Sequence, residues 1–263
     1  MIEALYWPRT AVDAWRGESV RLAGMTMRVP GTRRERLSVV AGNLRIHRLL
    51  DRWVSPGSTV IDVGANIGYN TIRAARRAGP HGRVVALEPT PDNLAVLRQN
   101  LAASGLANVV VEAVAAGRAA GTRDFFVRGE RSAVNSLFPD SCYAQVTDVL
   151  RVRVVPLDEL VDAADVIKID VEGAELDVLE GMTRLLRSPR ARLIVEWHPL
   201  LQRLAGYGAD ALPRWLLERG WQLQAASHLR LRPLPAVDIP AWTSRLLEQR
   251  SPVEILARRP VGA

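Results

Sequence analysis

Residues 60–71 read Val-Ile-Asp-Val-Gly-Ala-Asn-Ile-Gly-Tyr-Asn-Thr, and this stretch decides the fold class. Its first four residues predict a buried strand, because they are mostly β-branched and apolar. Gly64 and Gly68 predict a turn in which the backbone can approach a ligand, since glycine has no Cβ atom. A helix predicted over 70–77 follows, and its first turn offers free N–H groups. Strand, glycine turn and helix together indicate a cofactor-binding element.

Short apolar runs alternate with helical patterns beyond this stretch, which is typical of a parallel sheet covered by helices on both faces. The further predicted strands are 83–87, 108–114, 165–171 and 192–197, and the predicted helices are 92–104, 175–186 and 210–219. Two last strands, 221–224 and 253–256, have no helical pattern between them. We expect them to form an antiparallel hairpin at one edge, with Pro233, Pro235 and Pro240 in the long connection.

Residues 1–57 predict a cap over the sheet rather than an independent domain. A hairpin is expected over 20–29 around Gly24, and residues 43–54 predict an amphipathic helix with His47 and Leu50 near one face. Trp7 and Trp15 contribute either a homodimer contact or packing on the sheet.

The composition excludes several classes of protein. The 263 residues are 48% hydrophobic, which excludes disorder along the whole chain. The single cysteine, Cys142, excludes a disulfide framework and a cysteine-rich zinc site. This cysteine usage, with no visible signal peptide and no apolar run of about 18 residues, favours a cytoplasmic protein without a membrane span.

The net charge of +7 raises the question of nucleic-acid binding. Lys168 is the only lysine, and the arginines are spread along the chain. The largest groups are Arg33-Arg34 with Arg36, and Arg258-Arg259. A solvated basic surface is therefore favoured over a nucleic-acid interface.

Spacing selects the cofactor. A dinucleotide site needs Gly-x-Gly-x-x-Gly, but Asn66 stands where the second glycine belongs, and no Gly-Lys-Ser/Thr follows for a phosphate loop. S-adenosylmethionine has no phosphate, so it suits this turn, with Asp62 near its ammonium group. Glu88 ends the next strand, where a carboxylate accepts hydrogen bonds from ribose hydroxyls. The predicted cofactor residues are Asp62, Gly64, Ala65, Asn66, Gly68, Asn70, Thr71, Glu88, Pro89, Glu112, Ala113 and Asp170, with Glu112 and Ala113 at the adenine edge.

Charged residues crowd the end of the strand predicted over 165–171. Strand alternation places Lys168, Asp170 and Glu172 on one side. They form either part of an active site or an internal lysine–acid network. Glu175 follows as an acid at a helix N-terminus, which the helix dipole favours.

Glu196 and His198 end the strand predicted over 192–197 and, two residues apart, are expected to point into the same crevice. His198 is either a base or a structural histidine before Pro199. Asp170, Glu196 and His198 offer metal-type ligands, but no spacing signature supports them, so we expect no metal.

Residues 123–149 are the least regular part of the chain, with Phe125, Phe126, Asn135, Ser136, Phe138 and Tyr143. They form either a substrate-contacting insertion or a strand with a surface loop.

Four segments together resemble the FkbM family of S-adenosylmethionine-dependent methyltransferases. They are 60–71, 82–89 (Gly-Arg-Val-Val-Ala-Leu-Glu-Pro), 155–160 (Val-Pro-Leu-Asp-Glu-Leu) and 167–175 (Ile-Lys-Ile-Asp-Val-Glu-Gly-Ala-Glu). The resemblance spans about residues 43–200. It implies a class I methyltransferase fold, α/β and Rossmann-like, with a seven-stranded sheet over 58–263. It also implies O-methylation of a small-molecule, sugar or natural-product hydroxyl.

The expected catalytic residues are Asp170, Glu172, Glu196 and His198, with the last three as candidate bases. Two alternatives remain: an RNA methyltransferase on the same fold, and a non-catalytic cofactor-binding protein. The former is weakened because Asp170-Val-Glu-Gly replaces the Asp/Asn-Pro-Pro-Tyr/Phe signature of amine methylation. The Arg-rich cap suggests a polar or anionic acceptor.

Overall fold

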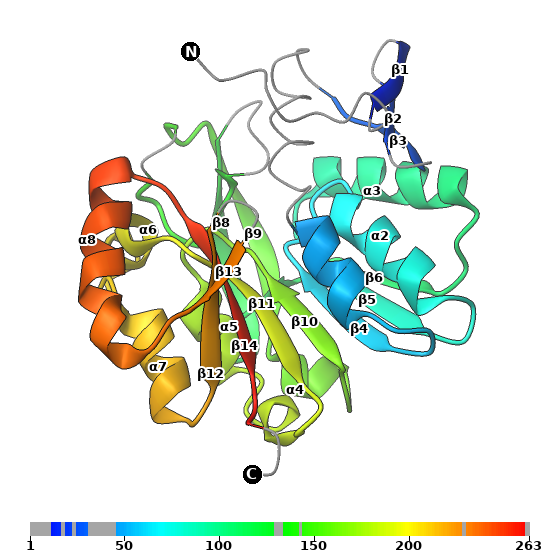
Figure 1. The fold of residues 1–263 in the computed structure, drawn as a ribbon. Coiled ribbons are helices and arrows are strands. Elements are labelled where there is room, and N and C mark those ends of the chain that lie inside the picture. Colours follow the sequence, from blue (N-terminus) through cyan, green and yellow to red (C-terminus); the bar gives the residue numbers. More distant parts are fainter. Residues whose placement is uncertain are drawn as a thin grey trace.

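The computed structural model describes residues 12–16, 19–22, 25–30, 46–128, 134–141, 144–227 and 230–260. It confirms an α/β fold with helices on both faces of a large sheet (Figure 1). Successive side chains of a strand pack against the helices on opposite faces of the sheet, because the strand is pleated. In strand β4 (Thr59–Val63), Val60 packs with the helix over 46–53, while Ile61 packs with Leu176 and Leu179 of helix α5 (Glu175–Glu180).

The large sheet has eight strands in the order β13-β12-β14-β11-β10-β4-β5-β6. The five strands from β11 to β6 are parallel, whereas β14 is antiparallel to both β11 and β12. Besides β4, the strands are β5 (Arg83–Leu87), β6 (Val109–Glu112), β10 (Val166–Ile169), β11 (Arg192–Trp197), β12 (Gln222–Ser227), β13 (Arg230–Pro233) and β14 (Val253–Arg258).

Helices cover this sheet, and the glycine turn leads directly into the first labelled one. Besides α5 and residues 46–53, they are α2 (Tyr69–Ala78), α3 (Pro91–Ser104), α4 (Leu157–Leu160), α6 (Pro199–Leu204), α7 (Ala211–Glu218), α8 (Ile239–Gln249) and the short 3-10 turns η2 (Leu185–Arg187) and η3 (Ala236–Asp238). No helix of the described ranges is long and apolar enough to cross a bilayer.

The last part of the sheet differs from the sequence prediction. Strands β12 and β14 do pair antiparallel, but helix α8 lies between them in the chain, and β14 is inserted next to β11 rather than left at an edge. Pro240 falls in the first turn of α8, where its missing N–H costs nothing. The edge strand is β13, in a segment predicted to be only a connection.

Helix α5 is also shorter than predicted, and ends at Glu180 instead of 186. Gly181 follows it, and glycine is a poor helix former. No side chain fits at this position, since a Cβ atom there would be 2.0 Å from the carbonyl oxygen of Gly117.

The N-terminal region forms a small antiparallel sheet of β1 (Val12–Arg16), β2 (Ser19–Leu22) and β3 (Met25–Arg28), which confirms the predicted hairpin strands. Met25 and Met27 pack with Ile72 of α2, and β3 contacts α3 (Figure 1). The boundary at residue 57 stays a prediction. Gly24, Cys142 and Tyr143, like residues 1–11 and 31–45 with Trp7 and the Arg33–Arg36 cluster, lie outside the described residues.

A second, three-stranded sheet borders the segment predicted to be irregular over 123–149, and its strands take up only residues 123–127 and 148–149 of that segment. Its order is β7 (Ala115–Ala116), β9 (Asp148–Val155) and β8 (Gly121–Val127), and β8 and β9 are antiparallel. Within it, residues 134–141 form a described loop that returns to β8 through backbone hydrogen bonds between Phe126 and Ser136.

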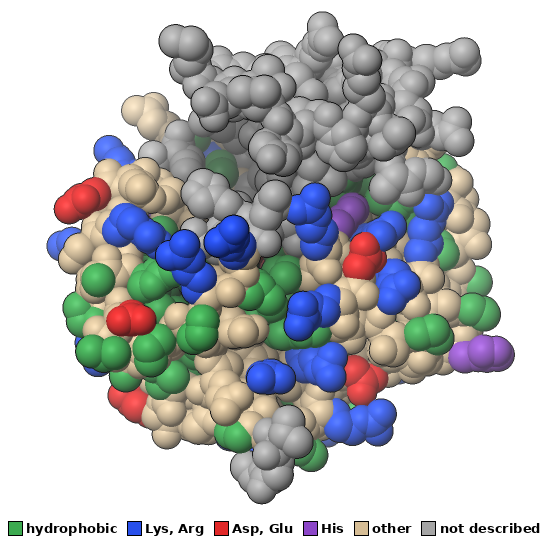
Figure 2. Space-filling model, in the orientation of Figure 1, with side chains coloured by type: hydrophobic (Ala, Val, Ile, Leu, Met, Phe, Trp, Pro, Cys, Tyr) green, Lys and Arg blue, Asp and Glu red, His purple; other side chains and the backbone are tan. Residues whose placement is uncertain are grey.

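Basic side chains are spread over the face shown in Figure 2, interspersed with acidic and apolar groups.

Candidate functional site

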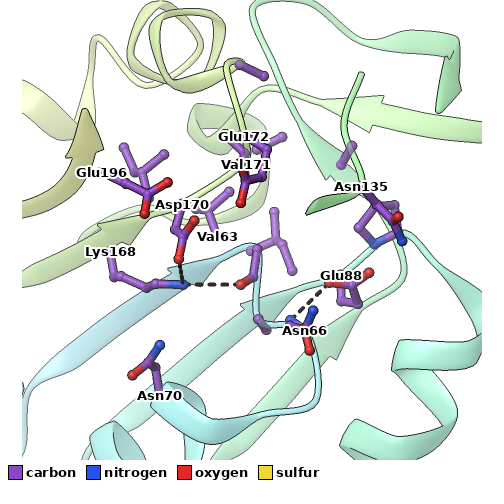
Figure 3. Close-up of a pocket in the computed structure, with 18 of the residues that line it drawn as sticks. Val63, Asn66, Asn70, Glu88, Asn135, Lys168, Asp170, Val171, Glu172 and Glu196 are labelled. Atoms are coloured by element: carbon purple, nitrogen blue, oxygen red, sulfur yellow. Dashed lines mark hydrogen bonds and ion pairs between the residues drawn. The ribbon is translucent and has the colours of Figure 1, made fainter. Parts of the chain in front are cut away.

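A cavity of about 370 Å³ lies at the carboxyl ends of β4, β5, β10 and β11. This is within the size range of small-molecule sites, and its place is where parallel sheets bind ligands. Its lining includes the glycine turn after β4, the end of β5, the end of β10 and the 134–141 loop (Figure 3).

The glycine turn is fixed by the strands on either side of it. Gly64 has φ +78°, and a Cβ atom there would be 2.0 Å from the carbonyl oxygen of Asp170. The N–H groups of Gly64 and Ala65 both donate to the Leu87 carbonyl, at 3.1 and 2.9 Å. Only glycine fits at residue 64, so this turn lies close against the end of β10.

Glu88 is buried and lines the cavity, as predicted. Its Oε1 accepts hydrogen bonds from Thr90 and from Asn93, whereas Oε2 accepts a hydrogen bond from the Asn66 N–H at 2.9 Å. Burial raises the pKa of Glu88, and these hydrogen bonds oppose that rise. Oε2 keeps acceptor capacity beside the cavity, which suits a ligand hydroxyl.

Asp62, expected near an ammonium group either directly or through water, does not line the cavity. It is buried beneath the turn, where Lys168 Nζ lies 3.3 Å from its Oδ1 and the Thr71 hydroxyl donates to its Oδ2 at 2.6 Å. Lys168 also lies 3.4 Å from Asp170 and donates to the Gly64 carbonyl at 3.2 Å. These carboxylates raise the pKa of Lys168 despite its burial, so it stays charged. Asp62 and Thr71 therefore support the turn from below.

Three carboxylates converge on the cavity from β11 and the turn after β10. One oxygen each of Asp170, Glu172 and Glu196 lies within 4.8 Å of the others, and Figure 3 shows these side chains grouped at one end of the cavity. Glu254 of β14, opposite Glu196 in register, lines the same cavity. Burial and the neighbouring acids raise the pKa of Glu172 and of Glu196 well above the ordinary value.

His198 lies outside the cavity lining, which corrects its prediction as a base in the crevice. Strand β11 ends at Trp197, so its alternation does not continue to residue 198. The His198 ring is instead the N-cap of α6 and accepts a hydrogen bond from the Leu201 N–H at 3.4 Å. Burial lowers the pKa of His198 to about 4, so the ring is neutral at pH 7.

The turn after β10 is held by Glu175. This buried carboxylate accepts hydrogen bonds from the N–H groups of Val171 and Gly173 and from the Gln202 carboxamide. Burial raises the pKa of Glu175 to about 7. Glu172, just before Gly173, has φ +56° and points its carboxylate toward the cavity.

The loop over 134–141 brings Asn135 and Leu137 to the cavity. The buried Arg128 guanidinium donates to three backbone carbonyls of this loop, those of Val134 at 2.9 Å, Phe138 at 2.7 Å and Pro139 at 3.1 Å, and to the Phe126 carbonyl of β8 at 3.3 Å. Ser136 donates to the Glu172 carbonyl at 2.7 Å, which joins the loop to the acidic cluster.

Some of the other predicted cofactor residues line the cavity, and some lie outside it. Ala65, Asn66, Asn70 and Pro89 line the cavity, whereas Gly68, Glu112 and Ala113 do not. Gly68 serves packing, since a Cβ there would be 2.5 Å from Leu97 Cδ1. The segment that continues β6 reaches the cavity two residues later, at residues 114–116. Sequence reasoning missed Leu137 and Glu254, and neither carries a local motif.

Comparisons with known proteins agree with this arrangement. The family model described as Methyltransferase FkbM domain matches residues 62–223. The hexuronic acid methyltransferase AglP of Haloferax volcanii is 31% identical over 168 residues, which cover 62% of this chain and 65% of that protein. The antimetabolite synthetase AmbE of Pseudomonas aeruginosa is 30% identical over 64% of this chain but only 10% of its own length. The chain thus spans less than two thirds of these relatives.

Among solved structures, a putative rRNA methylase from Clostridium thermocellum has a TM-score of 0.50 at 11% identity, covering 83% of this chain and 96% of that one. At this identity the similarity concerns the fold, and it supports the class I methyltransferase architecture.

Proposed function

Since the chain belongs to the FkbM family of S-adenosylmethionine-dependent methyltransferases, we propose that it methylates a hydroxyl oxygen of a small, polar acceptor such as a sugar. The observation that carries this proposal is the cavity itself, in which a site for a nucleoside and a cluster of carboxylates share one space.

The residues of the cavity fit the cofactor. The free acceptor capacity of Glu88 Oε2 suits the ribose hydroxyls, and Leu87, Pro89 and Val114 provide an apolar edge for adenine. Ala65 and Asn66 of the glycine turn and Asn70 of the first turn of α2 would hold the amino-acid part. When bound, the cofactor supplies an electrophilic methyl carbon on a sulfonium, and S-adenosylhomocysteine is the product that leaves.

The acidic cluster would receive the acceptor. Asp170 lies between the glycine turn and Glu196, so it faces both the cofactor part and the acceptor part of the cavity (Figure 3). A carboxylate of raised pKa is a suitable proton acceptor near neutral pH, which assigns Glu172 and Glu196 this role. The hydroxyl proton moves to one of them as the oxygen–carbon bond forms. Orientation of the acceptor in the cavity supplies much of the rate.

A small acceptor is favoured over RNA because the reacting groups line a cavity of limited volume whose described lining contains acids and no arginine. A polar or anionic acceptor, expected from the Arg-rich cap, stays a prediction, because the Arg33–Arg36 cluster lies outside the described residues. The relative AglP is named for hexuronic acid, and a sugar acceptor is consistent with that similarity. A cytoplasmic location and a homodimer remain predictions.

Two measurements test the proposal. Calorimetric titration with S-adenosylhomocysteine should show saturable binding, with NAD as the control that does not bind. Incubation with methyl-labelled S-adenosylmethionine and a panel of sugars, uronic acids and phenols should label a hydroxyl oxygen, and RNA should stay unlabelled. Labelled RNA with unlabelled small acceptors would reject the small-molecule assignment. Cofactor binding without transfer to any acceptor would favour a non-catalytic protein.

A further inference from the structure

We propose that Asp170, Glu172 and Glu196 bind one divalent cation of the Mg²⁺ or Mn²⁺ type, which in turn binds an oxygen of the acceptor. This inference rests on the proposed function, because it assigns the acceptor subsite of the same cavity.

The charge balance of the cavity calls for a cation. Lys168 lies within 3.4 Å of both Asp62 and Asp170, so one positive charge serves two carboxylates. The neighbours with the largest electrostatic effect on Glu196 are acidic: Asp170, Glu172, Glu254 and Glu175. Arg128 and Lys168 act on Glu172 electrostatically, but neither forms an ion pair with it among the described contacts. Carboxylates this close repel one another, and a bound cation offsets that repulsion.

An unsatisfied atom points to the same conclusion. Glu172 Oε2 is shut off from solvent and has no hydrogen-bond partner among the described residues. An enclosed carboxylate oxygen without a donor is costly, and a cation removes that cost. Figure 3 shows this carboxylate directed into the cavity near Asp170 and Glu196.

The ligand set indicates which kind of cation binds. All three ligands are carboxylate oxygens, and hard donors of this kind suit Mg²⁺ and Mn²⁺ rather than a zinc ion that prefers sulfur and nitrogen. Both ions keep open coordination positions when a protein supplies only a few ligands. An acceptor hydroxyl or carboxylate would take one of those positions. Without the cation, an acidic acceptor would meet four carboxylates and no free positive charge in the described lining.

The chemistry stays balanced with the cation in place. A hydroxyl bound to a divalent ion loses its proton more readily. With Glu172 and Glu196 bound to the cation, the proton goes to a carboxylate outside the ligand set, so Glu254, which lines the same cavity, takes their place as the proton acceptor. The charge of the bound ion does not change.

The test uses the full chain, stripped of metal by a chelator and titrated with MnCl₂ alone, with free Mn²⁺ measured by electron paramagnetic resonance. We expect one Mn²⁺ per chain, and an affinity at least about tenfold weaker in Glu172→Gln and in Glu196→Gln. Glu248→Gln, an exposed acid on α8, is the matched control and should bind like the wild type. Removing a negative charge from the cluster relieves repulsion, so both cavity variants should fold, which thermal melting checks.

Absence of binding to the wild type at 1 mM Mn²⁺, about the level of weak extracellular cation sites, would overturn the proposal, as would unchanged affinity in both cavity variants. Methyl transfer that persists in excess chelator would also overturn it, while leaving the proposed function intact. One bound Mn²⁺ lost in both variants, but without transfer to any hydroxyl, would uphold the cation site and reject the O-methylation.

Discussion

Replacing Lys168 by Met tests whether the buried ion pair under the glycine turn is a structural unit. Asp62 is 1% exposed and Lys168 is 3% exposed, so water does not compensate either charge. Breaking such a pair by removing one partner typically costs about 3–5 kcal/mol, because the other charge is left buried and unpaired. Asp170 cannot compensate the charge of Asp62 once Lys168 is removed, since both residues are carboxylates. We therefore expect Lys168→Met to lower the free energy of unfolding by about 3 kcal/mol.

Urea unfolding followed by tryptophan fluorescence measures this loss. Adding Asp62→Asn to Lys168→Met should recover about 2 kcal/mol, because the amide removes the orphaned charge while its oxygen still accepts from the Thr71 hydroxyl. The double variant should therefore be more stable than the Lys168→Met single variant. A loss below about 1 kcal/mol in the single variant, or a double variant less stable than the single one, would refute this reasoning.

Three further outcomes follow from the site. Glu88→Gln should weaken S-adenosylhomocysteine binding about tenfold in calorimetry, because one charge-assisted hydrogen bond is lost. The control Glu112→Gln, outside the cavity lining, should leave the affinity unchanged. Equal affinities of the two variants would remove Glu88 from the ribose site. The folded-state pKa of His198, about 4, lies below its unfolded value of 6.5, so stability present above pH 6.5 is lost as pH falls toward 4, by about 3 kcal/mol. His198→Asn keeps a good N-cap and should flatten this slope in urea midpoints at pH 7 and 4.5; an unchanged slope contradicts the assignment. Arg128→Met removes four hydrogen bonds and should speed amide hydrogen exchange in residues 134–141, whereas Arg151→Met, on the surface, should not; equal protection in both would mean that Arg128 does not hold the loop.

Local patterns predicted the part of the site that depends on local geometry. Gly64 and Glu88 each stand at the end of a strand recognisable from its own residues, and the carboxyl ends of neighbouring parallel strands meet at one edge. The same reasoning gave Asp170 and Glu196. It failed at His198, because the strand ends one residue earlier. It also did not show that Asp62 forms an ion pair with Lys168, because Lys168 comes from a strand about a hundred residues later in the chain and no local pattern indicates that contact.

Features that depend on contacts between segments far apart in the chain could not be predicted from local sequence patterns. Glu254 enters the cavity only because β14 lies beside β11, a choice made by sheet pairing and by the packing of α8. Likewise, arginine residues are usually exposed, and the burial of Arg128 follows from the path of the loop that it holds.

The position of β14 also constrains the order in which the molecule can assemble. This strand comes later in the chain than every other strand of the large sheet, yet it separates β11 from β12. During synthesis, β12 and β13 are therefore complete before the neighbour that joins them to the sheet exists. Until residues 253–258 emerge, the free edge of β11 has unpaired N–H and C=O groups that can recruit another nascent chain. A chaperone that covers this edge during synthesis should therefore raise the yield of native protein.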